Sequence, residues 1–358
     1  MKLKTMNLNK QVLTIGPNYK YLGGGIVSVL STYAKFNKDF IFMPTFNSEN
    51  NFINILQYPV LFSEIFYLLL VNKNISIVHI HGASYISFYR KYTIFLLCKY
   101  FFKKKVIFHI HGAEFHLFYK NGTSLRKKFI KHFIEKSDAI IVLSTYWENY
   151  FKSTFQLKNI FILNNIVPYP EIYKKEYSEE INFLFLGEIG KRKGTFELIE
   201  AINNIKNSFN GIINFYIGGN GDIKKFNSKI KEYKLENIIH YVGWITGNDK
   251  IELLKKSHVF ILPSYNEGLP ISILEAMSYR MPIISTPVGG IPEVLKEKVN
   301  GILVIPGNIK EIEEALKFFI TNPTKIKIMG DESYKIVQKF LPNQVIKDLH
   351  EIYRKISK

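Results

Sequence analysis

Short apolar runs alternate along the chain with longer segments in which apolar residues recur every three to four positions. Continuous apolar runs are typical of strands buried on both faces, and the longer period is typical of amphipathic helices. Strands are expected at residues 11–16, 40–44, 77–81, 106–111, 139–144, 160–163, 182–187, 212–218, 239–242, 259–262, 282–285 and 302–304. The alternation of strand and helix predicts an α/β fold with parallel sheets covered by helices.

The chain has 358 residues, which is too long for one ordinary core, so two doubly wound, Rossmann-like domains are expected. Pro168, Pro170 and a charged, patternless stretch up to residue 180 mark the boundary. We expect an N-terminal domain at 1–168, a C-terminal domain at 181–340 and a final helix at 341–358 that packs back on the first domain. Ligands of such folds bind at the carboxyl ends of the strands, so the residues there are the candidates for function.

The most informative strand end carries two carboxylates eight residues apart, Glu267 and Glu275, in the sequence YNEGLPISILEAM. The helix that follows would direct the backbone amides near Gly268 and Leu269 and its positive dipole end at a phosphate. Pro270 fits the first helical turn, where a missing N–H costs nothing. Carboxylates repel phosphate, so both glutamates are expected to accept hydrogen bonds from sugar or ribose hydroxyls. The alternative is a capping Glu267 and a solvated Glu275.

A second strand end places two cations, Arg192 and Lys193, just before a helix, after a loop bracketed by Gly187 and Gly190. Positive charge at a helix start is locally unfavourable, which indicates an anion nearby. These cations could neutralise the charge on a departing diphosphate. A solvated, lysine-rich turn is the alternative.

Other strand ends offer backbone groups to a ligand. They carry Gly24, Gly25, Gly218, Gly219, Gly243 and Trp244. Flexible turns and aromatic packing are the alternatives. Two further glycines, Gly289 and Gly290, are expected beside the Glu267 loop.

Four histidines end two neighbouring strands of the first half: His79, His81, His109 and His111. No carboxylate follows at ligand spacing, so we expect no metal. His111 precedes Gly112 and is predicted to donate to a substrate hydroxyl, with the other three packed and hydrogen-bonded.

The charge of +18 is uneven, since residues 1–170 hold 21 basic and 7 acidic residues, a net charge of 21 − 7 = +14. Residues 90–136 contain twelve basic and two acidic residues interleaved with aromatics. This composition suits an anionic lipid surface, and it also suits nucleic acid or a solvated face.

A single cysteine, Cys98, excludes an internal disulfide and favours a reducing compartment. We see no signal peptide, and the apolar stretches at 60–71 and 92–102 are too short to span a bilayer.

Several motifs resemble glycosyltransferase family 4, the retaining, nucleotide-sugar-dependent enzymes of GT-B fold, in which two Rossmann-like domains face each other across a cleft. They are FLGEIGKRKG, IGGNGD, VGW, PSYNEGLPISILEAMSYRMPIISTPVGGIPE and NGILVIPGN. The resemblance is close at 182–308 and looser before that, where GGG and HIHG match the family's glycine loop and histidine.

The resemblance implies that the C-terminal domain binds the donor and the N-terminal domain binds the acceptor. Glu275 would hold the ribose, Glu267 the transferred sugar and Lys193 the diphosphate. The family's arginine after the glycine is replaced here by Glu188, and Arg192 is the proposed substitute.

The implied reaction moves a hexosyl group from a UDP- or GDP-sugar to an acceptor hydroxyl with retention, without metal or other cofactor. With the basic first half, this predicts a cytoplasmic enzyme, peripheral on the inner face of a bacterial membrane, that extends a lipid-linked or oligosaccharide acceptor in polysaccharide biosynthesis. A soluble acceptor, a sugar-nucleotide epimerase of the same fold and a basic nucleic-acid-binding protein are the alternatives. The last is disfavoured because the charge is confined to one domain and no nucleic-acid motif is present.

Overall fold

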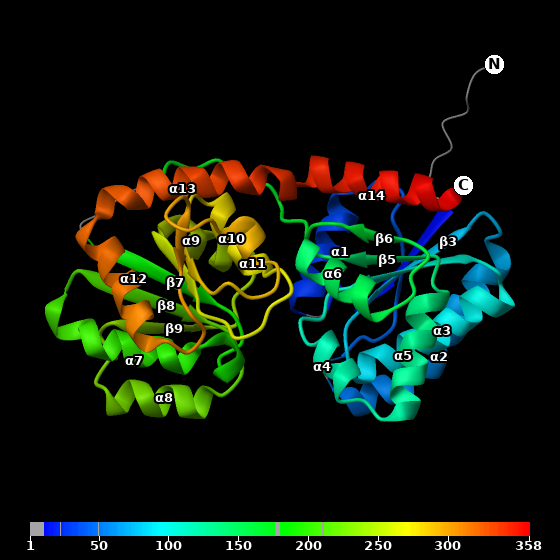
Figure 1. Cartoon of the computed structure of the whole chain (residues 1–358), viewed down its shortest axis with the longest axis horizontal. Coiled ribbons are helices and arrows are strands. Elements are labelled where there is room, and N and C mark those ends of the chain that lie inside the picture. Colours follow the sequence, from blue (N-terminus) through cyan, green and yellow to red (C-terminus); the bar gives the residue numbers. More distant parts are fainter. Residues whose placement is uncertain (1–10, 22, 49, 176–179, 210) are drawn as a thin grey trace, which may run out of the picture. The chain divides into compact units, whose positions relative to one another are not determined.

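A computed structural model describes residues 11–21, 23–48, 50–175, 180–209 and 211–358. The chain divides into two compact units (Figure 1). Unit 1 comprises Met1–Val167 and Phe340–Lys358, and unit 2 comprises Pro168–Lys339. The N-terminal lysines considered for a signal peptide and part of the predicted boundary, residues 176–179, lie outside the described residues.

Unit 1 is built on a six-stranded parallel sheet in the order β2-β1-β3-β4-β5-β6. Its strands are β1 (Val12–Gly16), β2 (Ile41–Pro44), β3 (Ile77–Gly82), β4 (Lys105–Ile110), β5 (Ala139–Val142) and β6 (Ile160–Ile162). Its helices are α1 (Gly25–Phe36), α2 (Asn51–Val71), α3 (Ile86–Leu96), the π-helical η2 (Leu97–Phe101), α4 (Phe115–Lys120), α5 (Ser124–Lys136), α6 (Thr145–Thr154) and α14 (Pro342–Ser357). Aromatic side chains such as Phe108 and Phe133 fill the core.

Unit 2 repeats this architecture with the parallel strand order β12-β11-β10-β7-β8-β9. Its strands are β7 (Ile181–Leu186), β8 (Ile213–Gly218), β9 (Ile239–Gly243), β10 (Val259–Leu262), β11 (Ile283–Ser285) and β12 (Gly301–Leu303). Its helices are η3 (Lys191–Lys193), α7 (Thr195–Ile205), η4 (Lys206–Ser208), α8 (Ile223–Glu232), α9 (Gly247–Lys256), α10 (Ile271–Ser278), α11 (Ile291–Val294), α12 (Ile309–Thr321) and α13 (Pro323–Val337), with η5 (Gln338–Phe340) leading into α14.

The predicted fold of two doubly wound α/β sheets is confirmed, because each range expected to be a strand overlaps one of the twelve strands. In unit 2, α10 packs with α13 on one side of the sheet and α7 packs with α12 on the other (Figure 1). Strands β10 and β7 are parallel neighbours in this sheet, so their carboxyl ends lie next to each other.

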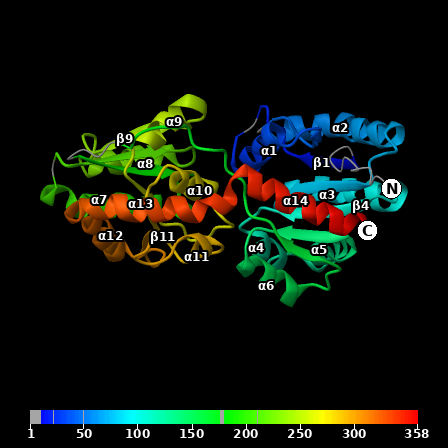
Figure 2. The same ribbon diagram turned by 90° about the horizontal axis from the view of Figure 1, so that it is seen from above.

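The C-terminal helix α14 belongs to unit 1 and packs against α1. Figure 2 shows it lying over the strands of that unit. The Tyr353 hydroxyl is 2.7 Å from Nδ1 of His79, and the imidazole of His350 is 3.3 Å from Oδ1 of Asn37. The last segment of the chain thus contributes side chains to the interior of unit 1.

Helix α2 departs from the expectation that apolar stretches stop short of bilayer length. The apolar pattern continues on both sides of Pro59, and the Asn50 side chain caps the helix by accepting from the amide of Phe52. Residues Phe52–Val71 are long and apolar enough to cross a membrane by length and composition. Core helices meet the same two criteria, so length and composition alone do not make α2 a transmembrane span.

Candidate functional site

Neighbouring strand ends in unit 2 bring together Lys193 and Glu267, which are 74 residues apart in sequence. Nζ of Lys193, after β7, lies 2.5 Å from Oε1 of Glu267, after β10. The hydroxyl of Ser264 donates to the same carboxylate oxygen at 2.7 Å. The two charged side chains are 12% and 6% exposed, so the pair is held at the sheet edge with little contact to water. Ser264 precedes Glu267 by only three residues, but nothing in the sequence pattern marks it as a site residue.

The glycines Gly289 and Gly290 lie against the Glu267 loop, which confirms the expectation for them. The amide of Gly290 donates to the carbonyl of Gly268 at 2.7 Å. Gly289 has φ of +56°, and a Cβ atom there would lie 2.0 Å from the carbonyl oxygen of Glu267. Only glycine fits this position, because the two backbones touch.

The glycine-rich loops that follow β7, β8 and β9 also pack together. The amide of Gly187 donates to the carbonyl of Gly218 at 3.0 Å, and the amide of Gly219 donates to the carbonyl of Gly243 at 2.8 Å. A Cβ atom at Gly219 would lie 1.8 Å from the Gly187 carbonyl oxygen. Trp244 follows at the end of β9 with half of its surface exposed. The backbones of Gly218, Gly219 and Gly243 thus lie close together at the ends of β8 and β9.

Glu275 lies on α10 and is 7% exposed. Its Oε1 accepts from Nζ of Lys250, on α9, at 2.6 Å. Nothing in the linear sequence indicated this partner. Helix α10 begins at Ile271, so Pro270 is the N-cap residue and lies one position before the first helical turn where the sequence placed it.

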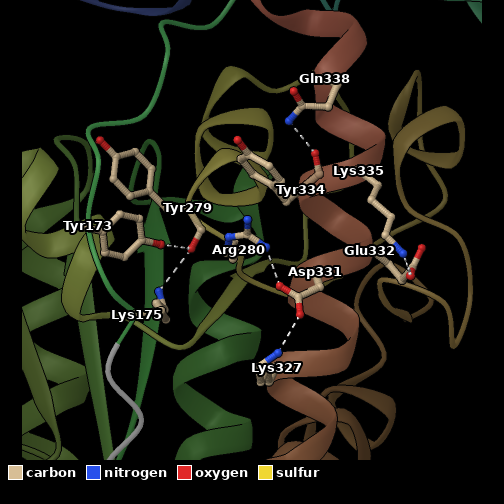
Figure 3. Close-up of polar contacts among 10 residues, drawn as sticks. All are labelled: Tyr173, Lys175, Tyr279, Arg280, Lys327, Asp331, Glu332, Tyr334, Lys335 and Gln338. Atoms are coloured by element: carbon tan, nitrogen blue, oxygen red, sulfur yellow. Dashed lines mark hydrogen bonds and ion pairs between the residues drawn. The ribbon is translucent and has the colours of Figure 1, made fainter.

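The C-terminal end of α10 is fixed by segments from both ends of unit 2 (Figure 3). The carbonyl of Tyr279 accepts from the hydroxyl of Tyr173 at 2.6 Å and from Nζ of Lys175 at 3.3 Å. Arg280 has φ of 55°, which ends the helix, and its guanidinium donates to Asp331 of α13 at 2.5 Å. These contacts position α10 and, through it, Glu275.

Arg192 pairs with Glu188, which stands where the resemblance implies an arginine. Its Nη2 donates to Oε2 of Glu188 at 2.7 Å, and the two side chains are 33% and 54% exposed. The backbone carbonyl of Arg192 also accepts from the amide of Tyr265, in the loop that carries Glu267. The guanidinium therefore lies on the solvent side of the loop, where its partner is a carboxylate.

The histidines of unit 1 stack at the carboxyl ends of β3 and β4. Nε2 of His111 and Nδ1 of His81 are 2.9 Å apart, and His111 also forms a side-chain hydrogen bond with Asn165. Burial lowers the pKa of His111 and the pKa of His79 to about 3. Burial likewise places the pKa of His81 and of His109 well below the usual value, so all four rings are neutral at physiological pH.

His109 departs from the expectation that the three inner histidines are all hydrogen-bonded, because neither of its ring nitrogens has a partner among the described residues. His79, His81 and His109 have ligand-type atoms within 4.8 Å of one another and could hold a metal ion by that criterion. The rings of His79 and His109 are stacked at 5.4 Å with planes 8° apart, an arrangement that suits ring packing. Metal ligation instead requires nitrogens that converge on one point.

Gly24 and Gly25 begin α1 in unit 1, where Gly24 has φ of 108°. They and His111 belong to unit 1, whereas Glu267 and Glu275 belong to unit 2.

Two family models match successive parts of the chain. Glycosyltransferase Family 4 matches residues 43–168, and Glycosyl transferases group 1 matches residues 171–336. Both models describe glycosyltransferases, and neither alone covers half of the chain, so the matches support a glycosyltransferase of this type.

Individual relatives agree with this assignment. The chain is 27% identical over 236 residues to an uncharacterized glycosyltransferase of Methanocaldococcus jannaschii, covering 64% of this chain and 63% of that one. It is 27% identical over 145 residues to the amylovoran biosynthesis glycosyltransferase AmsK of Erwinia amylovora, covering 38% and 35%. The matches thus span less than two thirds of these curated relatives.

The fold matches a solved structure over almost its full length. Anabaena HepE, solved in complex with UDP, superposes with a TM-score of 0.76 at 13% identity, covering 96% of this chain and 100% of that one. The expected GT-B fold is confirmed.

Proposed function

We propose that the protein is a retaining hexosyltransferase that moves a sugar from a nucleoside diphosphate sugar to an acceptor hydroxyl. The observation that carries this proposal is the buried pair of Lys193 and Glu267, which Ser264 supports at the junction of two strand ends. Gly187 and Gly289 lie against this pair, since a Cβ atom at Gly187 would lie 3.7 Å from Cδ of Lys193 and one at Gly289 would lie 2.0 Å from the carbonyl oxygen of Glu267. A cation beside a carboxylate suits a ligand with a diphosphate and hydroxyls.

Each residue of the proposed donor site has a role that its contacts allow. An ammonium carries three N–H groups, and the bond to Glu267 uses one, so Lys193 can also donate to the diphosphate. Oε1 of Glu267 accepts from Lys193 and Ser264, which leaves Oε2 to accept from a sugar hydroxyl. The amides near Gly268 and Leu269 would bind the phosphate or sugar, and Glu275 would hold the ribose hydroxyls.

The chemistry would proceed on one face of the donor sugar. The bond from the anomeric carbon to the phosphate oxygen breaks, and the bond to the acceptor oxygen forms on the same face. The proton of the acceptor hydroxyl passes to the departing diphosphate. Lys193 and the start of α10 would stabilise the charge on that diphosphate, so we propose that no metal or other cofactor is needed. In unit 1, neutral His111 would bind the acceptor hydroxyl by exchanging one of its present hydrogen bonds, to His81 or to Asn165.

We further propose a UDP- or GDP-sugar as donor and a lipid-linked or oligosaccharide acceptor, with the enzyme peripheral on the inner face of the cell membrane. HepE was solved with UDP, and AmsK is named for amylovoran biosynthesis. The basic first half of this chain suits an acceptor attached to an anionic membrane.

The test is a thermal-shift screen with UDP, GDP, ADP and their common sugars, followed by mass spectrometry with lipid-linked acceptors. We expect one nucleotide to raise the melting temperature of the wild type and to have little effect on Lys193→Met. Lys191→Met is the matched control, since it removes an exposed cation two residues away. Lack of stabilisation by every nucleotide, or transfer by Lys193→Met at the wild-type rate, would refute the proposal.

The proposed role of Arg192 has its own test. Arg192→Ala should weaken nucleotide binding, because a charge-assisted hydrogen bond to phosphate contributes about 1.5–3 kcal/mol. Glu188→Gln should strengthen it by releasing the guanidinium from its present partner. Unchanged donor affinity and turnover in Arg192→Ala would exclude Arg192 from the site.

A further inference from the structure

The outer side of α2 exposes an unusual number of large apolar side chains. Eight of them are 40–68% exposed: Phe52, Ile53, Ile55, Leu56, Val60, Tyr67, Leu70 and Val71. Several recur at spacings of three, four and seven residues, which places them on one face of the helix. We call these eight residues the α2 outer face. Figure 2 shows α2 at the edge of unit 1, away from the strands in the middle of the sheet.

The inner side of the same helix is also apolar. Leu61, Ile65 and Leu69 are at most 5% exposed and pack in the core of unit 1. Between Asn51 and Val71 the only charged residue is Glu64. A helix that is apolar all round is normally buried all round, yet only 22% of the most apolar window of α2 is buried. The α2 outer face therefore needs a partner outside this unit's core.

The apolar surface continues onto η2. The ring of Phe66 lies 5.6 Å from that of Phe101 and 5.3 Å from that of Phe102. Phe101 is 65% exposed, and Tyr100 beside it is 51% exposed. Exposed lysines follow each element, since Lys73 comes after α2 and Lys103 comes after η2.

We propose that the α2 outer face, together with Tyr100 and Phe101, docks in the plane of an anionic phospholipid membrane. This inference rests on the peripheral location proposed above and names the surface that achieves it. Apolar and aromatic side chains would enter the boundary between headgroups and acyl chains, and the flanking lysines would meet lipid phosphates.

Charge favours lipid over a second copy of the chain. The exposed Lys73 and Lys103 flank the apolar surface, so two such surfaces would repel each other, whereas an anionic bilayer attracts them. A spanning orientation is disfavoured because Leu61, Ile65 and Leu69 would have to leave the core. Docking in the membrane plane keeps these core contacts and covers only the exposed face.

The basic and aromatic segment at 90–136 fits this role less well than α2 does. Lys91 is fully buried, the side chain of Lys99 pairs with Asp138 at 2.6 Å, and Lys104 donates to the carbonyl of Ile75 at 2.5 Å. Three of the twelve basic residues of this segment are thus buried or bonded within unit 1. The apolar face, and not the count of basic residues, identifies the docking surface.

The experiment is co-sedimentation of the full chain with vesicles of phosphatidylcholine, alone or mixed with phosphatidylglycerol. No donor or acceptor is present, so binding is scored independently of transfer. We expect the wild type to bind the mixed vesicles, and Leu56→Glu to lower its partition coefficient about fiftyfold or more, from lost leucine burial plus one added charge. Gln57→Glu adds the same charge at an exposed position of the same helix and should lower partition no more than about fivefold.

A second measurement reports insertion directly. Tyr67→Trp adds a third tryptophan to the two native ones, and its emission should shift to the blue with mixed vesicles, relative to the wild type. The proposal is overturned if the wild type stays in the supernatant or if both charge variants weaken binding equally. It is also overturned if the wild type is a dimer without lipid and Leu56→Glu makes it a monomer, because a second copy then covers the face. Nucleotide stabilisation, measured on the same variants, should be unchanged, so loss of docking is distinguishable from loss of the donor site.

Discussion

Substitution of Gly289 by alanine should disturb the candidate donor site through a contact that the structure defines. A Cβ atom at Gly289 would lie 2.0 Å from the carbonyl oxygen of Glu267, and real Cβ contacts are not shorter than 3.0 Å. The Glu267 loop would therefore move by 3.0 − 2.0, or about 1 Å. A displacement of that size at a reacting group costs about 10²-fold in rate. The left-handed φ of +56° adds about 1–2 kcal/mol of strain, which lowers the melting temperature by roughly 2–8 °C.

Gly247→Ala separates strain from displacement. Gly247 has φ of +57°, almost the same as Gly289, and nothing lies within 4 Å of its Cβ position. Both variants should lose the stability that the left-handed φ costs, and Gly289→Ala should lose more because its loop must also move. Only Gly289→Ala should lose turnover, measured as release of nucleoside diphosphate from the donor that the screen identifies. Isothermal titration with the nucleotide would show whether binding or chemistry suffers. Equal turnover of the two variants would refute the argument that Gly289 acts through the position of Glu267.

Three further predictions concern charged groups of unit 2. Lys193→Met should destabilise the protein by about 3–5 kcal/mol because it leaves Glu267 buried without its cation. Adding Glu267→Gln should restore part of this loss. Equal denaturation midpoints for the single and double variants would contradict this prediction. Glu275→Gln should weaken nucleotide binding about tenfold, whereas a 2′,3′-dideoxy nucleotide should bind wild type and variant alike, and an undiminished penalty with that analogue would exclude a ribose contact. Burial lowers the pKa of Lys175 to about 7 from 10.5, so the unfolded chain holds more protons between these values and stability should rise with pH across that window. Lys175→Met should lack this rise, and parallel melting curves of the two proteins from pH 7 to 10 would show the reasoning to be wrong.

The strands could be predicted from the sequence because parallel strands buried on both faces are continuous apolar runs. Val259–Leu262 is buried throughout, and nothing in its pattern competes with a strand. The predicted positions of helix and strand ends are less accurate, since these ends depend on individual hydrogen bonds and backbone angles. Pro270, for example, caps α10 and does not begin it.

The candidate site could be predicted residue by residue but not as an assembly. Glu267 and Lys193 were each recognised at a strand end, yet their contact depends on β7 lying next to β10. Strand order in a doubly wound sheet is a long-range property that periodicity does not contain. The same reason explains why Lys250 was missed, because it reaches Glu275 from a neighbouring helix.

In unit 1, one charged side chain is buried and several apolar side chains are exposed, which the amino-acid composition does not predict. Lys91 is completely buried, with its ammonium 4.9 Å from the ring of Phe46, whereas Leu56 is 64% exposed. An apolar side chain gains by leaving water whether the surface that covers it belongs to its own core or to another body. The sequence pattern therefore shows that α2 is apolar on every side, but it does not show which surface covers each side. The structure accounts for the inner side with core residues such as Ile65, and the outer side then has to be explained by a partner.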